Sequence, residues 1–287
     1  MSAPAKVLLF GGTSRIAARA INALVARNSS VMVLTGRPWD IPATPATYRP
    51  ASGGGLEHAL VELTTYDGTH TLHWQRRYDA IISVAPLKYV ARVLDYLPDP
   101  AGTRAVFLSS NNAALLGGSA DYADTRAAED GVLSGPLDSV VLQPTAICGH
   151  SGDAVLGELD RRVRAGKTVW LPGARTRQTP VHFEDVADAL LHALSADVPA
   201  GRYSVSGPEQ ADYLEMVRML EAANGTQART RPLPAAPIRM LGRLTRHPRG
   251  AQLRRAGIDR LPVNPSLPGF TPHRSIADMI ASLSALP

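Results

Sequence analysis

The sequence predicts an α/β protein built on a doubly wound parallel sheet, and three observations support this prediction. Short apolar runs of strand length alternate with segments of helical periodicity along the first half of the chain. The first run, KVLLF at 6–10, ends in a pair of glycines. The intervening helices supply the crossover connections that parallel strands need. The 287-residue chain can bury about three quarters of its unfolded surface.

The expected elements follow one another in chain order. After the first strand, apolar residues recur at helical spacing over 16–24, which predicts a helix to about Arg27. A second strand, SVMVLTGR, ends at Arg37, and residues 38–55, rich in Pro and Gly, are expected to form a loop. A helix is expected over 85–97. The remaining strands are expected in HALVELT, YDAIISVAP, RAVFLSS and SVVLQPTAI.

Composition narrows the class of protein. A hydrophobic content of 45% and a charged content of 19% are typical of a globular protein. The single cysteine, Cys148, excludes an internal disulfide and suits a reducing compartment. No apolar run has the length of a signal peptide or a membrane span. We therefore expect a cytoplasmic protein without a membrane partner.

Basic residues are concentrated near the C-terminus. The net charge is +5, and nine arginines but one acidic residue, Asp259, lie between Arg229 and Arg260. Such a segment is a solvated basic surface, a pocket for an anionic substrate or a nucleic-acid surface. It has no interleaved aromatic residues, which argues against nucleic acid.

The turn after the first strand lies where a doubly wound sheet binds its ligand. A dinucleotide-binding turn needs glycines for the tight bend, for close approach of the pyrophosphate and for helix packing. The chain has Gly11, Ser14 and Ala17 at those positions. Ser14 departs from the pattern, but its hydroxyl could donate to a phosphate at the helix N-terminus.

Arg37 predicts the choice of dinucleotide. It ends the second strand, where an acid would bind the ribose of NAD and an arginine would accept the 2′-phosphate of NADP. Arg15, in the turn itself, could assist. We therefore expect NADP rather than NAD. Two solvent-facing arginines are the alternative interpretation.

Several motifs occur in a characteristic order along nearly the whole chain. They are LLFGGTSRIA, VFLSSNNAALLG, YADTRAAE, VVLQPTAICG, TPVHFEDVADALLHAL, GRYSVSGPEQADYLEMVRML and GFTPHRSIADMI. In order and spacing they resemble an extended short-chain dehydrogenase/reductase of the NAD-dependent epimerase/dehydratase branch. The resemblance implies a Rossmann-type sheet with a small C-terminal substrate-binding lobe.

The same resemblance implies a catalytic set. In the family a serine and a tyrosine act on the substrate oxygen, while a lysine four residues after the tyrosine binds the nicotinamide ribose and favours tyrosine ionisation. Carried over, these roles fall on Ser110 and Tyr122, with Arg126 in place of lysine. Arginine also carries a positive charge, but its planar guanidinium is larger than the ammonium group of lysine. The alternative is a vestigial pair, with Arg126 bound to Glu129 or Asp130.

The resemblance also implies the residues that bind the dinucleotide. They are Gly11, Thr13, Ser14, Arg15, Ile16, Arg37, Ala85 and Pro144. No metal site is expected, because His70 and His73 have no acid or cysteine at a useful spacing.

Three departures weaken a nucleotide-sugar epimerase interpretation. Gln143 stands where the family usually has arginine before Pro144. Tyr122 follows Ser110 by only 12 positions, a shorter spacing than is common in the family. Gln178 stands where nucleotide-sugar enzymes often carry a phosphate-binding arginine.

These observations predict domains and a function. We expect a dinucleotide-binding core over 1–146, a substrate-lobe insertion over 147–180, a return to the core over 181–206 and a C-terminal substrate lobe over 207–287. The expected function is an NADP-dependent oxidoreductase or epimerase acting on a small or anionic carbonyl or alcohol compound. The alternative is a non-redox protein on the same fold, either a dinucleotide-sensing regulator or an enzyme without hydride transfer. A homodimer is a possible assembly.

Overall fold

The structure is a computed structural model that describes residues 6–35, 56–60, 77–116, 118–120, 122–150, 152–244 and 253–285. The chain divides into two compact units. Unit 1 comprises Met1–Gln143, Val186–Ser204 and Asn264–Thr271, and unit 2 comprises Pro144–Asp185, Val205–Val263 and Pro272–Pro287. The expected division differs from these units at its boundaries, because 144–146, 181–185 and 205–206, which were expected in the core, belong to unit 2. Asn264–Thr271, which was expected in the C-terminal lobe, belongs to unit 1. The loop expected over 38–55 lies outside the described residues.

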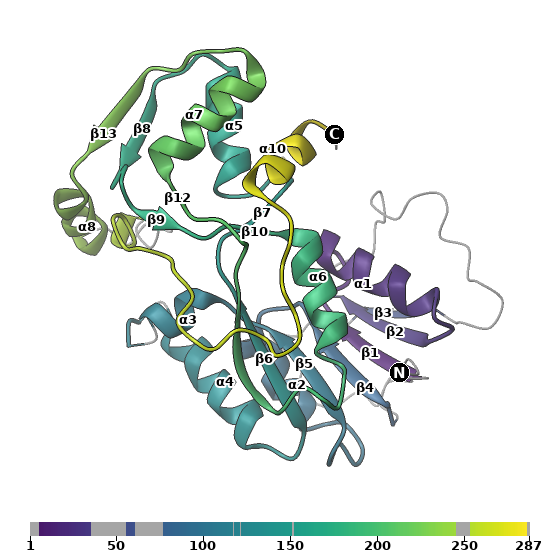
Figure 1. Cartoon of the computed structure of the whole chain (residues 1–287). Helices are drawn as coiled ribbons and strands as arrows, with labels where there is room; N and C mark the ends of the chain where they lie inside the picture. Colours follow the sequence, from purple (N-terminus) through teal and green to yellow (C-terminus); the bar gives the residue numbers. More distant parts are fainter. Residues whose placement is uncertain are drawn as a thin grey trace. The chain divides into compact units, whose positions relative to one another are not determined.

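Unit 1 is built on a sheet of seven strands in the order β11-β6-β5-β4-β1-β2-β3 (Figure 1). All pairings from β3 through β6 are parallel. The order reverses between β1 and β4, which makes this the switch point of a doubly wound sheet. The predicted fold class is confirmed. The strands are β1 (Lys6–Phe10), β2 (Ser30–Thr35), β3 (Leu56–Leu60), β4 (Ala80–Ser83), β5 (Arg104–Leu108), β6 (Asp138–Pro144) and β11 (Gly201–Val205).

Helices cover both faces of this sheet. On one face, α2 (Leu87–Leu94) and α4 (Ala123–Ser134) pack into the same hydrophobic cluster as Leu8 and Phe10 of β1. On the other, α1 (Arg15–Val25) buries an apolar stripe that repeats at helical spacing. The strands are buried on both faces and therefore form continuous apolar runs.

Two further helices lie in the described part of unit 1. α3 (Asn111–Leu116) follows β5 and contacts α4. α6 (Phe183–His192) starts in unit 2 and continues into unit 1, where Asp188 accepts hydrogen bonds from Arg19 of α1 at 3.0 and 3.1 Å. This bidentate pair joins the two helices on one face of the sheet.

The residues of unit 2 that the structure describes form three small sheets and a helical core. The sheets pair β10 with β7, β12 with β9 and β13 with β8. The strands are β7 (Ile147–Cys148), β8 (Val169–Pro172), β9 (Arg177–Gln178), β10 (Val181–His182), β12 (Ala211–Asp212) and β13 (Thr230–Leu233), and the helices are α5 (Leu156–Arg164), α7 (Tyr213–Asn224), α8 (Ala235–Leu244) and α10 (Ile276–Ala285). Helices α5, α7 and α10 contact one another around buried Leu156, Met216 and Met279. Among the described residues no helix is both long and apolar enough to cross a membrane.

Asp212 fixes the start of α7. Its carboxylate accepts a hydrogen bond from the backbone N–H of Glu215 at 2.8 Å, and the Glu215 carboxylate accepts one from the N–H of Asp212 at 2.8 Å. Arg175 contacts the same aspartate at 3.1 Å. Burial alone would raise the pKa of the Asp212 carboxyl, but these hydrogen bonds and the Arg175 charge hold the pKa below its usual value.

We predict that Asp212→Asn makes the stability of the protein less sensitive to acid. Because the folded-state pKa is lowered, ionised Asp212 contributes stability above the pKa of unfolded aspartate, about 3.9. That contribution is lost as the pH falls through the folded-state value. Urea unfolding at about pH 7 and about pH 3 should therefore show a smaller loss for Asp212→Asn than for the native protein. Asp95→Asn, which removes an exposed carboxyl, is the control, and equal losses in all three proteins would contradict the prediction.

Candidate active site

The turn that follows β1 has the backbone geometry of a dinucleotide-binding turn. Gly11 has φ +88°, in the left-handed region that favours glycine. A Cβ on Gly11 would lie 2.6 Å from the backbone nitrogen of Ala85, which follows β4. The backbones after β1 and β4 thus approach closely at the switch point, where this fold binds its ligands.

Ser14 has a structural role that accounts for its departure from glycine. It is the N-cap of α1, and its Oγ accepts a hydrogen bond from the backbone N–H of Ala17 at 3.1 Å. This bond satisfies one of the four amides that a first helical turn leaves without an intrahelical partner. The other first-turn amides and the helix macrodipole favour an anion at this end. The hydroxyl proton of Ser14 remains able to donate, since Oγ acts here as an acceptor.

The other predicted cofactor residues occupy varied environments. Thr13 is exposed, Arg15 is half-buried and Ile16 is buried, all at the start of α1. Pro144 is the last residue of β6 and the first residue of unit 2. Arg37 lies outside the described residues. The structure therefore brings Gly11, the start of α1 and Ala85 together within unit 1.

Ser110 and Tyr122 each precede a helix of unit 1. Ser110 follows β5, and its Oγ accepts a hydrogen bond from the N–H of Asn112 at 3.2 Å in the first turn of α3. Tyr122 is the half-buried N-cap residue of α4. Because α3 contacts α4, the two residues stand at the starts of two adjacent helices beyond the carboxyl end of β5.

Arg126 lies one turn into α4 and faces acidic residues of the same helix. Its Nη1 lies 3.8 Å from a carboxylate oxygen of Glu129, and its Nε lies 3.7 Å from one of Asp130. Both distances exceed that of a hydrogen bond, and the side chain is 39% exposed. These are the ion pairs of the alternative interpretation, in which Arg126 binds the acids rather than a ribose.

Glu129 is fully buried and forms the centre of a polar network. It accepts hydrogen bonds from Ser109 Oγ at 2.5 Å, from Gln143 Nε2 at 2.8 and 2.9 Å and from Arg202 Nε at 3.1 Å. The Gln143 carbonyl oxygen in turn accepts from Asn264. A neutral glutamine before Pro144 therefore supplies donors to Glu129, while the positive charge comes from β11.

Sequence reasoning missed Arg202. Its guanidinium contacts both Glu129 and Asp130, and its side chain is 20% exposed. It lies 73 positions from Glu129 in the sequence, so no local spacing indicates the pair. The only indication in the sequence was that position 143 carries glutamine where the family usually has an arginine, so that the positive charge must come from elsewhere.

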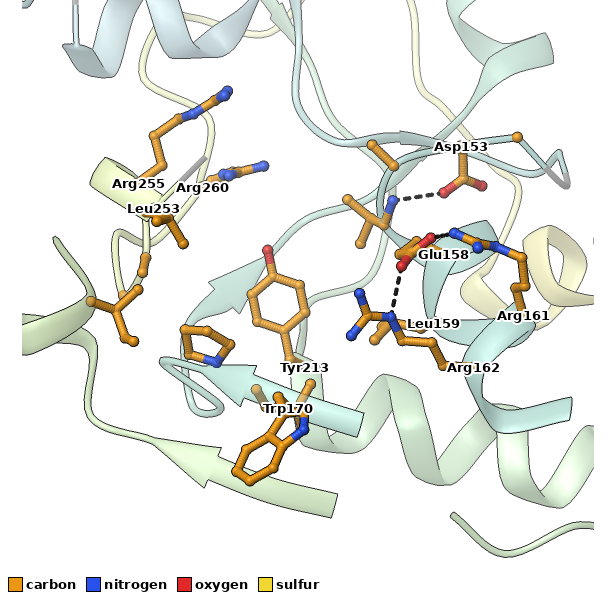
Figure 2. A pocket seen from close by; sticks show the side chains of 18 residues that line it. Asp153, Glu158, Leu159, Arg161, Arg162, Trp170, Tyr213, Leu253, Arg255 and Arg260 are labelled. Carbon is orange, nitrogen blue, oxygen red and sulfur yellow. Dashed lines mark hydrogen bonds and ion pairs between the residues drawn. The ribbon is translucent and has the colours of Figure 1, made fainter. Parts of the chain in front are cut away.

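A separate cavity of about 840 Å³ lies wholly within unit 2. Trp170 of β8, which is 53% exposed, and Tyr213 at the start of α7 provide aromatic surface (Figure 2). Arg255 and Arg260 stand on one side of the cavity, and Glu158 of α5 stands on the other. Glu158 is paired with Arg161 and Arg162 of its own helix. This cavity combines cations with aromatic surface and suits an anionic ligand that carries a ring.

The basic segment between Arg229 and Arg260 divides into three groups in the structure. Two arginines hold the fold, since Arg239 and Arg254 donate to backbone carbonyls at 3.0 and 2.8 Å. Two line the cavity, namely Arg255 and Arg260. The exposed arginines are Arg229, Arg231 and Arg243, and Arg246 and Arg249 lie outside the described residues.

Among the remaining candidates, Cys148 supplies no reactive group. Cys148 is fully buried, and burial together with the nearby Asp153 carboxylate raises the pKa of its thiol. The thiol is therefore neutral and shielded, unlike a nucleophilic cysteine. The described residues contain no group of three or more potential metal ligands. His70 and His73 lie outside them.

Comparison with solved structures confirms the fold. MoeE5 in complex with UDP-glucuronic acid and NAD is 17% identical, with 97% of each chain covered and a TM-score of 0.70. UDP-glucuronic acid 4-epimerase from Bacillus cereus, in complex with UDP-glucuronic acid and NAD, is 14% identical over 96% of this chain and 97% of that chain, with a TM-score of 0.67. The epimerase Mth375 from Methanothermobacter thermautotrophicus is 10% identical over 98% and 91%, with a TM-score of 0.71. No protein-family model and no curated protein sequence matches the chain.

This chain has the fold that its resemblance to the extended short-chain dehydrogenases/reductases implied. The expected preference for NADP, however, is wrong. MoeE5, the Bacillus cereus epimerase, and WbmF and WbmG of Bordetella bronchiseptica are all complexes with NAD. The prediction relied on the charge of Arg37, but a guanidinium also stacks on uncharged planar groups, so that charge does not require a 2′-phosphate.

We predict that Ser14 stabilises α1 as its cap. Ser14→Ala should lower the free energy of unfolding by about 1 kcal/mol, whereas Ser14→Gly should lower it by only a few tenths of a kcal/mol, because glycine is accepted at an N-cap. Urea unfolding measures both values. Ser134→Ala, at the exposed end of α4, is the matched control. Equal losses for Ser14→Ala and Ser14→Gly would contradict the capping role.

Proposed function

We propose that this chain is an NAD-dependent oxidoreductase or epimerase that acts on an anionic carbonyl or alcohol substrate. The observation that carries the proposal is the close approach of Gly11 and Ala85 at the switch point of the sheet. This close approach lies beside the capped N-terminus of α1. The fold is shared with proteins whose structures were solved as NAD complexes.

The residues of the turn fit a dinucleotide. A side chain at Gly11 would collide with the backbone of Ala85, so only bare backbone fits there, and bare backbone lets a pyrophosphate approach. The first-turn amides of α1 and the Ser14 hydroxyl would hold the phosphates. When bound, the nicotinamide supplies the site that accepts or returns a hydride.

The proton is moved by side chains of unit 1. We assign the acid/base role to the Tyr122 hydroxyl, which gives or takes the proton of the substrate oxygen. We assign to Ser110 a hydrogen bond to the same oxygen, because its Oγ accepts from the Asn112 N–H and its hydroxyl proton remains able to donate. Arg126, one turn from Tyr122, provides positive charge and donors for the ribose.

The cavity of unit 2 supports an anionic substrate that carries a ring. Arg255 and Arg260 match phosphate or carboxylate oxygens, and Trp170 and Tyr213 offer faces to a planar or sugar ring. MoeE5 was solved with UDP-glucuronic acid and with UDP-glucose. The substrate class that we propose is therefore a sugar nucleotide or a comparable anionic sugar derivative.

One observation favours a second candidate, a non-redox protein that senses the dinucleotide. Arg126 lies near Glu129 and Asp130, and an arginine retained by those carboxylates would leave the ribose without its cation. Such a protein would bind NADH yet turn over no substrate. Binding and turnover therefore separate the two candidates.

We predict that the chain binds NADH through its glycine turn. Titration followed by reduced-nicotinamide fluorescence should show saturable binding, and Gly11→Ala should weaken it at least about tenfold, or about 1.4 kcal/mol. Gly131→Ala is the matched control, because a Cβ there meets no neighbouring atom. Thermal unfolding of each variant verifies that it is folded. Absence of NADH binding to the native chain would end the proposal.

We predict that Tyr122→Phe lowers turnover at least about a hundredfold, the loss expected when a general acid/base is removed. UDP-glucuronic acid with NAD is the first substrate to assay, by separation of the sugar nucleotides after incubation. Arg126→Lys should retain measurable activity, because lysine also supplies a cation to the ribose. Full activity in Tyr122→Phe would contradict the assigned role.

A further inference from the structure

Two acids and two arginines form a cluster at the junction of α4 and β11. We call Glu129, Asp130, Arg126 and Arg202 the acid–arginine cluster. Three of its members lie on α4, and Arg202 lies on β11. Its formal charges balance at two negative and two positive, so each carboxylate has a cation without recruiting any other residue.

The two arginines do not contribute equally. Arg202 lies at hydrogen-bond distance from both acids, with its Nε 3.1 Å from Glu129 and its Nη2 in direct contact with Asp130. Arg126 lies 3.8 and 3.7 Å from the same two carboxylates and is about twice as exposed, at 39% against 20%. Closer and less hydrated ion pairs are stronger. Arg202 is therefore the principal counter-ion, and the pairs of Arg126 are readily exchanged.

The burial of Glu129 makes the choice of its counter-ion important. Glu129 is fully buried, and a buried carboxylate without a cation is strongly unfavourable. Ser109 and Gln143 donate hydrogen bonds to it but carry no charge. Within the described part of the chain, Arg126 and Arg202 are the cations paired with Glu129. If Arg202 were removed, Arg126 would become the remaining counter-ion and would be held by the carboxylates.

We propose that Arg202 is a positioning residue that occupies Glu129 and Asp130 and thereby leaves Arg126 available to the ribose of a bound dinucleotide. This inference rests on the proposed function, in which Arg126 serves the ribose. It also accounts for Gln143, since the charge that an arginine would supply there comes instead from β11.

The test is a double-mutant cycle on NADH binding to the full chain, followed by reduced-nicotinamide fluorescence. Arg202→Met should raise the Kd for NADH at least about tenfold, because Arg126 is then retained by the acids. Arg126→Met should raise it by a similar factor. The double variant should bind no more weakly than Arg126→Met alone, because Arg202 acts only through Arg126.

Two controls separate this role from a structural one. Arg104→Met removes another buried, paired arginine of unit 1, which lies at the start of β5 and contacts Asp138 at 2.8 Å. It should lower the unfolding temperature without changing the Kd for NADH. Arg202→Lys retains the charge and should restore most of the binding lost in Arg202→Met. If Arg202→Met does not fold, Arg202→Gln, which also removes the charge but keeps a polar side chain, takes its place in the cycle.

The outcomes are distinct. If the native chain binds no NADH, the proposed function fails and this inference fails with it. If the native chain binds NADH but Arg202→Met binds it equally well, the inference alone is overturned. Losses of NADH affinity that add in the double variant would likewise overturn it. So would a loss of NADH affinity in Arg104→Met equal to that in Arg202→Met. Non-additive losses with rescue by lysine support it.

Discussion

The buried carboxylate of Glu129 ties the helix that carries Tyr122 and Arg126 to the central sheet. Its donors come from the end of β5, from β6 and from β11, through Ser109, Gln143 and Arg202. A buried charge requires both hydrogen bonds and a counter-ion, so this arrangement specifies the position of α4 more strictly than apolar packing would. The starts of α3 and α4, where Ser110 and Tyr122 stand, are thereby held at one edge of the sheet.

The glycine turn imposes the second constraint. Parallel strands β1 and β4 bring two backbones so close at the switch point that Gly11 has no room for a side chain. Ser14, which breaks the glycine pattern, sits where a helix needs a cap and supplies one. One residue thus serves the stability of α1 while leaving its N-terminus suited to an anion. At this position a helix cap thus stands in place of the glycine of the usual pattern.

The cavity of unit 2 is lined by residues from separate parts of the chain. Trp170 comes from β8, Tyr213 from α7, and Arg255 and Arg260 from a segment near the C-terminal end. The basic segment therefore has no single role, because some of its arginines hold backbone carbonyls while others face the cavity. Charge composition alone could not separate these uses.

The sequence by itself predicted strands β1 to β6, helices α1 and α2, the parallel topology and the glycine turn, because these follow from periodicity and turn chemistry between near neighbours. The resemblance of its motifs to the extended short-chain dehydrogenases/reductases also indicated Ser110, Tyr122 and Arg126. Only the tertiary structure decided what surrounds Arg126, because its neighbour Arg202 reaches Glu129 across 73 positions and no local pattern records such a contact. The NADP expectation failed for a related reason. A single charge at Arg37 does not define a binding site until the groups around it are placed together in space.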